Sequence, residues 1–155
     1  MTLNNQTLVV SEAGQKGLGV FAKAPFKIGV LVASGKPLSF SHLKSAHSFQ
    51  IDVDLHAEFD EPARLINHSC DPNLGIINNQ FRGYDFIALR DIKRGEELGW
   101  DYCTTEFISI AIRDKCLCES KICRVKISGF CDLPEFLKKK YEPFIASYLR
   151  QLHQT

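Results

Sequence analysis

Three cysteines lie close together near the C-terminal end of the chain, in the pattern Cys116-x-Cys118-x4-Cys123. A loop this short can wrap a tetrahedral metal ion, and thiolates are good ligands for zinc. Three thiolates leave one coordination position open, so a fourth ligand must come from elsewhere. The spacing therefore favours a zinc site at this loop. Buried, reduced thiols without metal are the alternative.

The composition describes a small protein with one core. The chain has 155 residues, of which 45% are hydrophobic, which is enough for one core and too little for two comfortable domains. The 19 basic and 18 acidic residues nearly cancel, so direct nucleic-acid binding is not expected. No apolar run approaches the roughly 20 residues that span a membrane, and Met1 to Val10 is too polar for a signal peptide. We expect an intracellular protein that does not contact membranes, in which the six cysteines stay reduced or bind metal.

Strand signals dominate the first half of the chain. Between Leu8 and Val32, short aliphatic and β-branched runs are interrupted by glycine and proline, which predicts short strands joined by tight turns and no helix. Residues 33–60 show little periodicity. There we expect a loop with one short strand at Phe49 to Val53 and little else.

A hairpin is predicted in the middle of the chain. The run from Leu74 to Ile77 and the alternation from Tyr84 to Leu89 flank a turn near Asn78 and Asn79, because asparagine tolerates positive φ. A third strand is expected after Gly95.

The last twenty residues change to a helical period. Pro134 and Pro143 stand where they can start helices and interrupt between them, which predicts two short packed helices. Lys138 to Lys140 lie on the polar side and are interpreted as a solvated face. The apolar residues at helical spacing are Phe136, Leu137, Tyr141, Phe144, Ile145, Tyr148, Leu149 and Leu152.

Three segments carry candidate chemistry, and each is ambiguous alone. Residues 16–22 contain two glycines one residue apart, which let a backbone turn sharply or approach a ligand, but the third glycine of a dinucleotide fingerprint is missing. Residues 64–73 gather polar side chains after an apolar start, and residues 95–102 end in Trp-Asp-Tyr. A solvated loop and a half-buried structural tyrosine are the simpler interpretations of the last two.

Together, the three segments resemble the motifs of the SET-domain family of protein-lysine methyltransferases. Gly17-Leu18-Gly19 resembles the first motif, residues 64–73 match the long Asn-His-Ser-Cys motif almost position for position, and Glu97 to Tyr102 match the Glu-Leu-x-x-Asp-Tyr motif. Their order and spacing agree as well, and the likeness covers roughly residues 8–130. It implies transfer of methyl from S-adenosylmethionine to the side-chain amine of a lysine in a protein, a histone or another acceptor.

The resemblance also implies a fold. It is mainly β with short helices, and the second and third motifs thread together as a pseudoknot beneath the cofactor. We expect a SET domain at residues 1–115, with an abbreviated insert at about 33–60, then a post-SET zinc loop at 116–132 and a C-terminal helical extension at 133–155. The insert has no clear counterpart of the family's tyrosine-containing second motif, and no cysteine-rich domain precedes the SET motifs.

By resemblance, specific residues take specific roles. Tyr102 would lie where methyl meets lysine, and Trp100, two positions earlier, would limit the product mainly to monomethyl-lysine because its indole is bulky. The fourth zinc ligand would be Cys70, which closes an all-sulfur and therefore structural site with Cys116, Cys118 and Cys123. The predicted cofactor-binding residues are Gly17, Leu18, Gly19, Asn67, His68, Tyr102 and Leu117, with simple loop packing as the alternative for Leu117.

The reaction makes physical demands that these residues can meet. A lysine amine has a pKa of about 10.4 and must lose its proton before it attacks, so an apolar channel with aromatic walls helps. Tyr102 is expected to orient the reacting groups rather than act as a general base, because a neutral phenol is a poor proton acceptor. Cys103 and Cys131 are interpreted as small buried hydrophobic residues.

Two other classes of function compete with the transferase. One is a binding module with the same fold that engages a lysine peptide or cofactor without transfer, which intact Asn67, His68 and Tyr102 disfavour. The other is a small zinc-stabilised nucleic-acid-binding module, which the near-neutral charge disfavours. The target protein stays open, and the protein is expected in the cytoplasm, or in the nucleus if it acts on chromatin.

Overall fold

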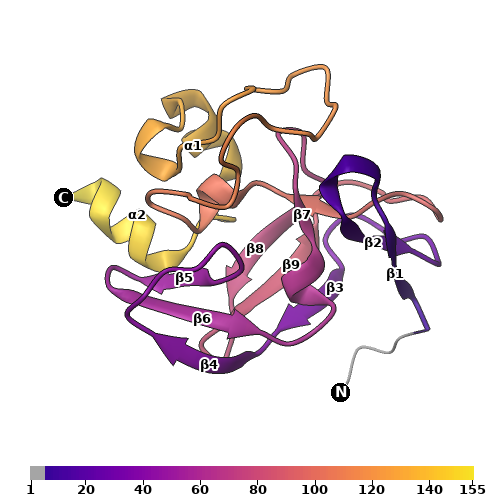
Figure 1. The fold of residues 1–155 in the computed structure, drawn as a ribbon, viewed down its shortest axis with the longest axis horizontal. Helices are drawn as coiled ribbons and strands as arrows, with labels where there is room; N and C mark the ends of the chain where they lie inside the picture. The colour runs from indigo at the N-terminus through magenta and orange to yellow at the C-terminus, as the bar shows by residue number, and fades with distance from the viewer. Residues whose placement is uncertain (1–5) are drawn as a thin grey trace.

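β-strands dominate the computed structural model of the protein, which describes residues 6–155 (Figure 1). Two helices, α1 (Glu135–Tyr141) and α2 (Ser147–Gln154), follow the strands. The strands are β1 (Leu8–Glu12), β2 (Leu18–Ala22), β3 (Leu31–Gly35), β4 (Pro37–Ser41), β5 (Phe49–Asp52), β6 (Leu55–Phe59), β7 (Asn67–His68), β8 (Leu74–Asn78), β9 (Tyr84–Ala88) and β10 (Gly99–Trp100). The predicted fold, mainly β with short helices near the C-terminus, is confirmed.

The strands form several small sheets rather than one large sheet. β1 pairs with β2, β3–β9–β8 and β4–β6–β5 form three-stranded sheets, and β7 pairs with β10. Single 3-10 turns occur at Gly14–Lys16, Ala63–Leu65, Tyr102–Thr104 and Phe130–Asp132. The first of these turns falls within residues 8–32, where no helical structure was expected. It is a single turn, stabilised by a hydrogen bond from the Gly17 N–H to the Gly14 carbonyl. A single turn is too short to show a helical period of apolar residues, so the sequence did not predict it.

The predicted hairpin is confirmed as β8 and β9, which pair antiparallel from Leu74↔Ala88 to Asn78↔Tyr84. Asn79 stabilises the turn, since its side-chain oxygen accepts hydrogen bonds from the backbone N–H groups of Phe81 and Gly83. The strand expected after Gly95 is present only as the two residues of β10, and it pairs in parallel with β7 rather than with the hairpin.

The prediction for residues 33–60 was wrong in one respect. The predicted strand at Phe49 is β5, but β4 and β6 flank it in sequence and complete the three-stranded sheet β4–β6–β5. β4 is an edge strand in which four of five residues are exposed, so its side chains show no alternation between apolar and polar. Its backbone pairing with β6 stabilises it, and that pairing leaves no periodic trace in the sequence.

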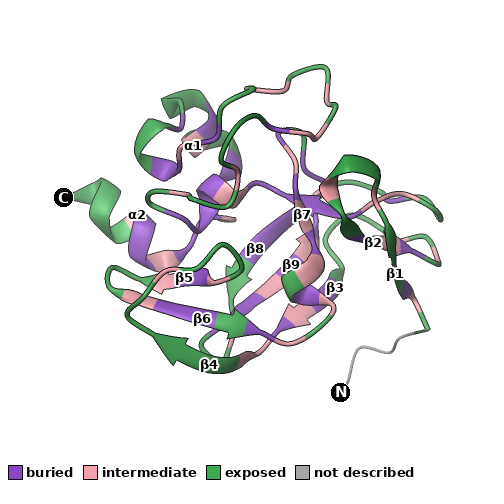
Figure 2. Cartoon of the chain, viewed as in Figure 1, coloured by how far each residue is buried: buried purple, intermediate pink, exposed green. Residues whose placement is uncertain are grey.

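The core lies where these sheets meet. Phe49 of β5 stacks on Phe59 of β6 with ring centroids 4.1 Å apart, and it also stacks on Trp100 of β10 at 5.4 Å. Phe86 of β9 closes the cluster with its ring edge against Trp100. Figure 2 shows buried residues along β8 and β9 and exposed residues along β4. Each such aromatic pair contributes about 0.5–1.5 kcal/mol beyond area burial, so the cluster holds β10 firmly.

The two C-terminal helices are confirmed, but their apolar face is only partly buried. Leu137, Tyr141, Tyr148 and Leu149 are buried, whereas Phe136 is 70% exposed and Leu152 is 42% exposed. The helices pack against the segment after Tyr102, since the Ala146 N–H donates to the carbonyl of Thr104. No helix among residues 6–155 is long and apolar enough to cross a membrane.

The two remaining cysteines differ from each other. Cys103 is buried, as expected, but Cys131 is exposed, so that prediction was wrong. Cys131 belongs to the 3-10 turn Phe130–Asp132, in which Phe130 supplies the buried side chain and the next residue points outward.

Candidate active site

The site is built where β7 and β10 lie side by side. Asn67 pairs with Gly99 and His68 pairs with Trp100, which joins residues 64–73 to residues 97–102. Asn73 reinforces this junction, because its side chain donates to the carbonyl of Glu97 and accepts from the N–H of Gly99, both at 2.9 Å. A side chain on Gly99 would collide with Ser69, so this close pairing requires glycine. The two motifs that the sequence singled out therefore form one structural unit.

The glycine-containing segment packs against this unit. The Asn67 side chain donates to the Leu18 carbonyl at 2.8 Å and to Glu97 Oε1 at 3.1 Å. A Cβ on Gly19 would lie 2.7 Å from that same Glu97 oxygen, so no larger residue fits there without displacing the carboxylate. Lys16 forms an ion pair with the other oxygen of Glu97. Lysine, carboxylate and amide thus form one polar network at the edge of β7.

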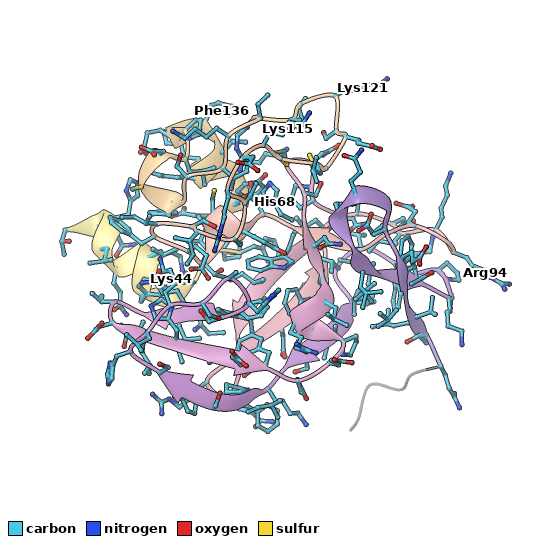
Figure 3. All side chains as sticks on the ribbon, viewed as in Figure 1. Lys44, His68, Arg94, Lys115, Lys121 and Phe136 are labelled. Atoms are coloured by element: carbon cyan, nitrogen blue, oxygen red, sulfur yellow. The ribbon has the colours of Figure 1, made fainter. Side chains whose placement is uncertain are left out.

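A cavity of about 430 Å³ opens beside this network. Its volume falls within the range of about 300–1,000 Å³ that is typical of small-molecule sites. Charged groups of both signs line it, which suits a ligand that carries both an amine and a carboxylate. The lining residues from the two motifs are Asn67, His68, Ser69, Asp71, Asn73, Glu97, Leu98 and Gly99, together with Lys16, Arg90, Cys118, Ser120, Lys121 and Ile122. Lys121 lies on the loop above the sheets, and His68 lies below it in the interior (Figure 3).

His68 connects the cavity to Tyr102. The backbone N–H of Tyr102 donates to His68 Nδ1 at 3.1 Å, which requires that Nδ1 carry no proton. The hydrogen is then on Nε2, which lies 3.3 Å from the sulfur of Cys70. Burial lowers the pKa of His68 to about 4, so the imidazole is neutral at neutral pH. The ring is therefore a fixed bridge between the backbone amide of Tyr102 and the sulfur of Cys70.

A second, smaller cavity of about 40 Å³ lies next to Tyr102. Phe49, Trp100 and Tyr102 provide aromatic walls, and Glu106 provides a carboxylate. The Tyr102 hydroxyl and the Trp100 indole N–H both donate to the carbonyl of Ile66, at 3.2 and 3.3 Å. Burial raises the pKa of Tyr102, so the phenol stays protonated and acts as a donor. The centroids of the His68 and Tyr102 rings, which line different cavities, are 5.2 Å apart.

The four predicted metal ligands come together. The Sγ atoms of Cys70, Cys116, Cys118 and Cys123 all lie within 4.8 Å of one another, and those of Cys70 and Cys116 are 3.9 Å apart. A tetrahedral zinc with sulfur at about 2.3 Å has sulfur–sulfur edges of roughly 3.8 Å, so the cluster fits zinc. Burial raises the pKa of the Cys70 thiol to about 12. A divalent cation removes this obstacle, since thiols that coordinate it are deprotonated.

Backbone geometry also suits a thiolate cluster. The N–H of Arg124 points at Cys70 Sγ and the N–H of Val125 points at Cys123 Sγ, each at 3.4 Å. Hydrogen bonds to a charged acceptor are stronger than neutral ones, so these amides favour the deprotonated sulfurs. Val125 adopts φ of 65°, an uncommon conformation for a β-branched residue, and this turn brings its N–H to the sulfur.

Arg124 also belongs to the surroundings of the site, and sequence reasoning missed it. Its guanidinium contacts Asp101, with a hydrogen bond from Nη2 to Oδ1 at 2.9 Å and an ion pair between Nη1 and Oδ2 at 2.8 Å. The Asp101 side chain is fully buried. This pair fastens the cysteine loop to the residue before Tyr102. The one signal in the sequence was the position of Arg124 directly after Cys123.

The predicted site residues are mostly brought together. Asn67 and His68 line the larger cavity, whereas Trp100 and Tyr102 line the smaller one. Gly17, Leu18 and Gly19 do not line the larger cavity, although their neighbour Lys16 does. Leu117 does not line it either, while Cys118 and Ser120 on the same loop do. Phe49 and Glu106 were also missed, since both lie outside the three recognised segments.

Comparison with known proteins identifies the family. The SET domain matches residues 17–103. The chain is 33% identical over 104 residues to an H3 lysine-9 specific histone-lysine N-methyltransferase of Fusarium mangiferae, which covers 57% of this chain and 29% of that protein. It is 30% identical over 138 residues to the histone-lysine N-methyltransferase ATX2 of Arabidopsis thaliana, which covers 76% of this chain and 12% of that protein. The chain thus spans less than a third of these relatives.

A solved structure agrees with the sequence comparisons. The crystal structure of KRYPTONITE in complex with mCHH DNA, an H3(1–15) peptide and SAH superposes with a TM-score of 0.63 and 23% identity, over 77% of this chain and 29% of that chain. At this identity the likeness shows the fold. On the matched motifs, the fold and these relatives, the chain belongs to the SET-domain family.

Proposed function

We propose that the protein transfers a methyl group from S-adenosylmethionine to the side-chain amine of a lysine in a protein substrate, and that histone tails are among its substrates. The contact between the rings of His68 and Tyr102 carries this proposal, because one ring lines the larger cavity and the other lines the smaller one. Methyl transfer needs two binding places that meet at one point. The relatives named as histone-lysine methyltransferases support this choice of reaction.

The larger cavity is the proposed cofactor site. Asn67 and His68, which line this cavity, would hold the cofactor's amino-acid and adenosine parts, whereas Gly17 to Gly19 and Leu117 do not line it and would reach the cofactor only at its edge. The charges of Lys16 and Glu97 on the cavity wall suit the carboxylate and the amine of a bound amino-acid group. S-adenosylmethionine, when bound, supplies an electrophilic methyl group on sulfur.

The smaller cavity is the proposed entry point for lysine. Its aromatic walls keep water away from the amine, which favours the neutral amine over an ammonium that has no counter-ion. Tyr102, whose hydroxyl is fixed on the Ile66 carbonyl, would orient the amine. Fixing the attacking atom in line with the departing group contributes several kcal/mol to lowering the barrier. Trp100 fills one wall of the cavity and would limit the room for further methyl groups.

We further propose one structural zinc in the cluster of Cys70, Cys116, Cys118 and Cys123, within a post-SET loop at residues 116–132. The zinc would hold Cys118 to Ile122 in place, and these residues form one wall of the proposed cofactor site. It would also fix His68 through Cys70, because the imidazole points at that sulfur. Loop, metal and cofactor would then fold together.

The test combines methyl transfer with the variant Tyr102→Phe. Labelled S-adenosylmethionine is incubated with the protein and core histones, and in parallel with a cell lysate, and mass spectrometry locates methylated lysines. Tyr102→Phe removes only a hydroxyl, so it should keep the fold and most of the cofactor affinity but lose at least about tenfold in turnover, or roughly 1.4 kcal/mol. Ser39→Ala, which removes an exposed hydroxyl on β4 outside both cavities, is the control and should retain activity.

Two results would contradict the proposal in different ways. If the protein binds S-adenosylmethionine but methylates nothing in histones or lysate, the fold serves as a binding module. If Tyr102→Phe turns over as fast as the unmodified protein at saturating substrate, Tyr102 is not the orienting residue. A histone substrate would place the protein at chromatin in the nucleus. Direct nucleic-acid binding is not proposed, since the formal net charge is +1, and a mobility-shift assay at moderate salt would test this.

A further inference from the structure

Glu106 is a buried carboxylic acid beside the smaller cavity that none of the roles described above uses. It is 6% exposed and lies four residues after Tyr102. Its backbone N–H donates to the Tyr102 carbonyl at 2.9 Å, and its carbonyl accepts from the N–H of Phe130 at 2.8 Å. Its side-chain Oε1 accepts from the N–H of Gln50 at 2.8 Å. These bonds fix the carboxylate in one position relative to Tyr102.

The carboxylate has unused capacity as an acceptor. Among the described residues, Glu106 forms no ion pair within 4.0 Å, and only one of its carboxylate oxygens accepts a hydrogen bond from the protein. A buried carboxylate without a cation is costly, so a protein tolerates one where a ligand supplies the cation. Glu106 lines the smaller cavity together with Phe49, Trp100 and Tyr102. Three aromatic rings and one carboxylate are the groups that recognise an ammonium ion.

The size of the cavity fits this ligand. A volume of about 40 Å³ exceeds the 10–15 Å³ that one water needs, and it is far below that of the larger cavity. It can hold the end of an aminoalkyl chain. The side chains of His47 and Arg64 also line it, and the charge of Lys44 acts on Glu106. The buried phenols of Tyr84, Tyr102 and Tyr148 complete the surroundings of the carboxylate.

We propose that Glu106 binds the ammonium group of the target lysine in this cavity and accepts one of its protons before methyl transfer. The inference rests on the proposed methyltransferase function and names the proton acceptor of that same site. The step balances as follows: the lysine ammonium and the carboxylate become a neutral amine and a carboxylic acid. The amine's lone pair then forms the new N–C bond as the S–C bond breaks, and the electron pair of the S–C bond stays on the sulfur, which becomes a thioether. Glu106 later gives its proton to solvent.

The ionisation of Glu106 suits this task. Burial raises its pKa to about 7, while the hydrogen bond from Gln50 and the charge of Lys44 partly oppose this shift. A base with a pKa near the working pH has both a useful ionised fraction and useful proton affinity. Because only the ionised form accepts a proton, activity should rise with pH through a limb near 7.

The first test is the pH profile of Glu106→Gln, which keeps the shape and removes the charge. At pH 7, kcat/KM for histone methylation should fall at least about tenfold, and the limb near pH 7 should vanish. Near pH 10 the lysine loses its proton to solvent, so the difference from the unmodified protein should shrink to less than about threefold. A purely structural role predicts a loss that is equal at all pH values. His47→Asn should keep the limb, and Glu58→Gln, an exposed acid on β6, should keep the full activity.

The second test needs no methyl transfer. Butylammonium, which matches the lysine side chain, is titrated into the protein while NMR follows the indole N–H of Trp100, the one tryptophan. The signal should shift with butylammonium but not with butan-1-ol, and Glu106→Gln should weaken the ammonium response at least about fivefold. A response in a protein that methylates nothing would support ammonium recognition and refute the proposed function. Equal responses in both proteins, no response in either, or methylation by Glu106→Gln at the unmodified rate at every pH would overturn the role of Glu106.

Discussion

The ion pair between Arg124 and Asp101 yields the sharpest prediction about stability. Arg124→Met keeps much of the side-chain volume but leaves the Asp101 carboxylate, whose side chain is fully buried, without its cation. Breaking a buried pair from one side costs about 3–5 kcal/mol, because the remaining charge loses its partner. The Cys103 N–H still donates to Asp101 at 3.0 Å and the Tyr141 hydroxyl also interacts with this carboxylate, so we expect about 3 kcal/mol, at the lower end of that range.

Urea unfolding at saturating zinc measures this change, with the fluorescence of the buried Trp100 as the signal. The double variant Arg124→Met with Asp101→Asn removes both charges and should recover at least about 1.5 kcal/mol of the loss, because no unpaired charge remains. Arg113→Met, a substitution at an exposed position before the cysteine loop, is the matched control and should change stability by less than about 0.5 kcal/mol. A cost below about 1 kcal/mol for Arg124→Met, or no recovery in the double variant, would refute the pairing argument.

Three further predictions address the metal, the acid and the product. Elemental analysis should find one zinc per chain, and joint replacement of Cys116 and Cys118 by serine should abolish it; full retention would sink the assignment. Glu106 binds its proton more tightly in the folded protein, with a pKa of about 7 against an ordinary 4.5, so stability should decline as pH rises from about 4.5 to 7. In urea unfolding, the stability of Glu106→Gln relative to the unmodified protein should therefore increase by about 2.5 kcal/mol between pH 5 and pH 8. The same pH dependence in both proteins would contradict this. Trp100→Phe should shift products from mainly monomethyl-lysine toward di- and trimethyl-lysine at matched turnover, whereas predominant trimethylation by the unmodified protein would refute the volume argument.

The local pattern of the chain was a good guide wherever one face of an element is buried. Strand β9 and the helices α1 and α2 bury one side, so their buried residues recur at the strand or helix period, whereas the first three residues of β8 are buried in succession and show as a short continuous run. β4 buries neither face, and its pairing with β6 is set by backbone hydrogen bonds that no side-chain period records. Two-residue strands such as β7 and β10 are too short for any period.

Site residues that lie within one recognised motif could be predicted from the sequence. Site residues that come together from distant segments were harder to predict. Asn67, His68 and Tyr102 stand within motifs, and the cysteine spacing predicted a metal loop. Glu106 and Phe49 carry no motif. They reach the cavity because Gln50, next to Phe49, donates to Glu106 from a position 56 residues away in the chain. Such partners emerge from the tertiary fold, since nothing local distinguishes a buried acid from a solvated one.

The wall that residues 118–122 contribute to the larger cavity makes loop folding and ligand binding one equilibrium. A ligand that contacts both Cys118 to Ile122 and Asn67 can bind only when the loop is folded against β7, as it is in this structure. Such a ligand stabilises the folded loop by RT ln(1 + [L]/Kd), which is about 2.7 kcal/mol at a hundredfold excess over Kd. This coupling is reciprocal: an interaction that stabilises the folded loop increases the affinity for the ligand by the same factor by which the ligand favours the folded loop. Amide protons of residues 118–122 should thus exchange more slowly as ligand is added, and the affinity of the cavity is a property of the loop as much as of the strands beneath it.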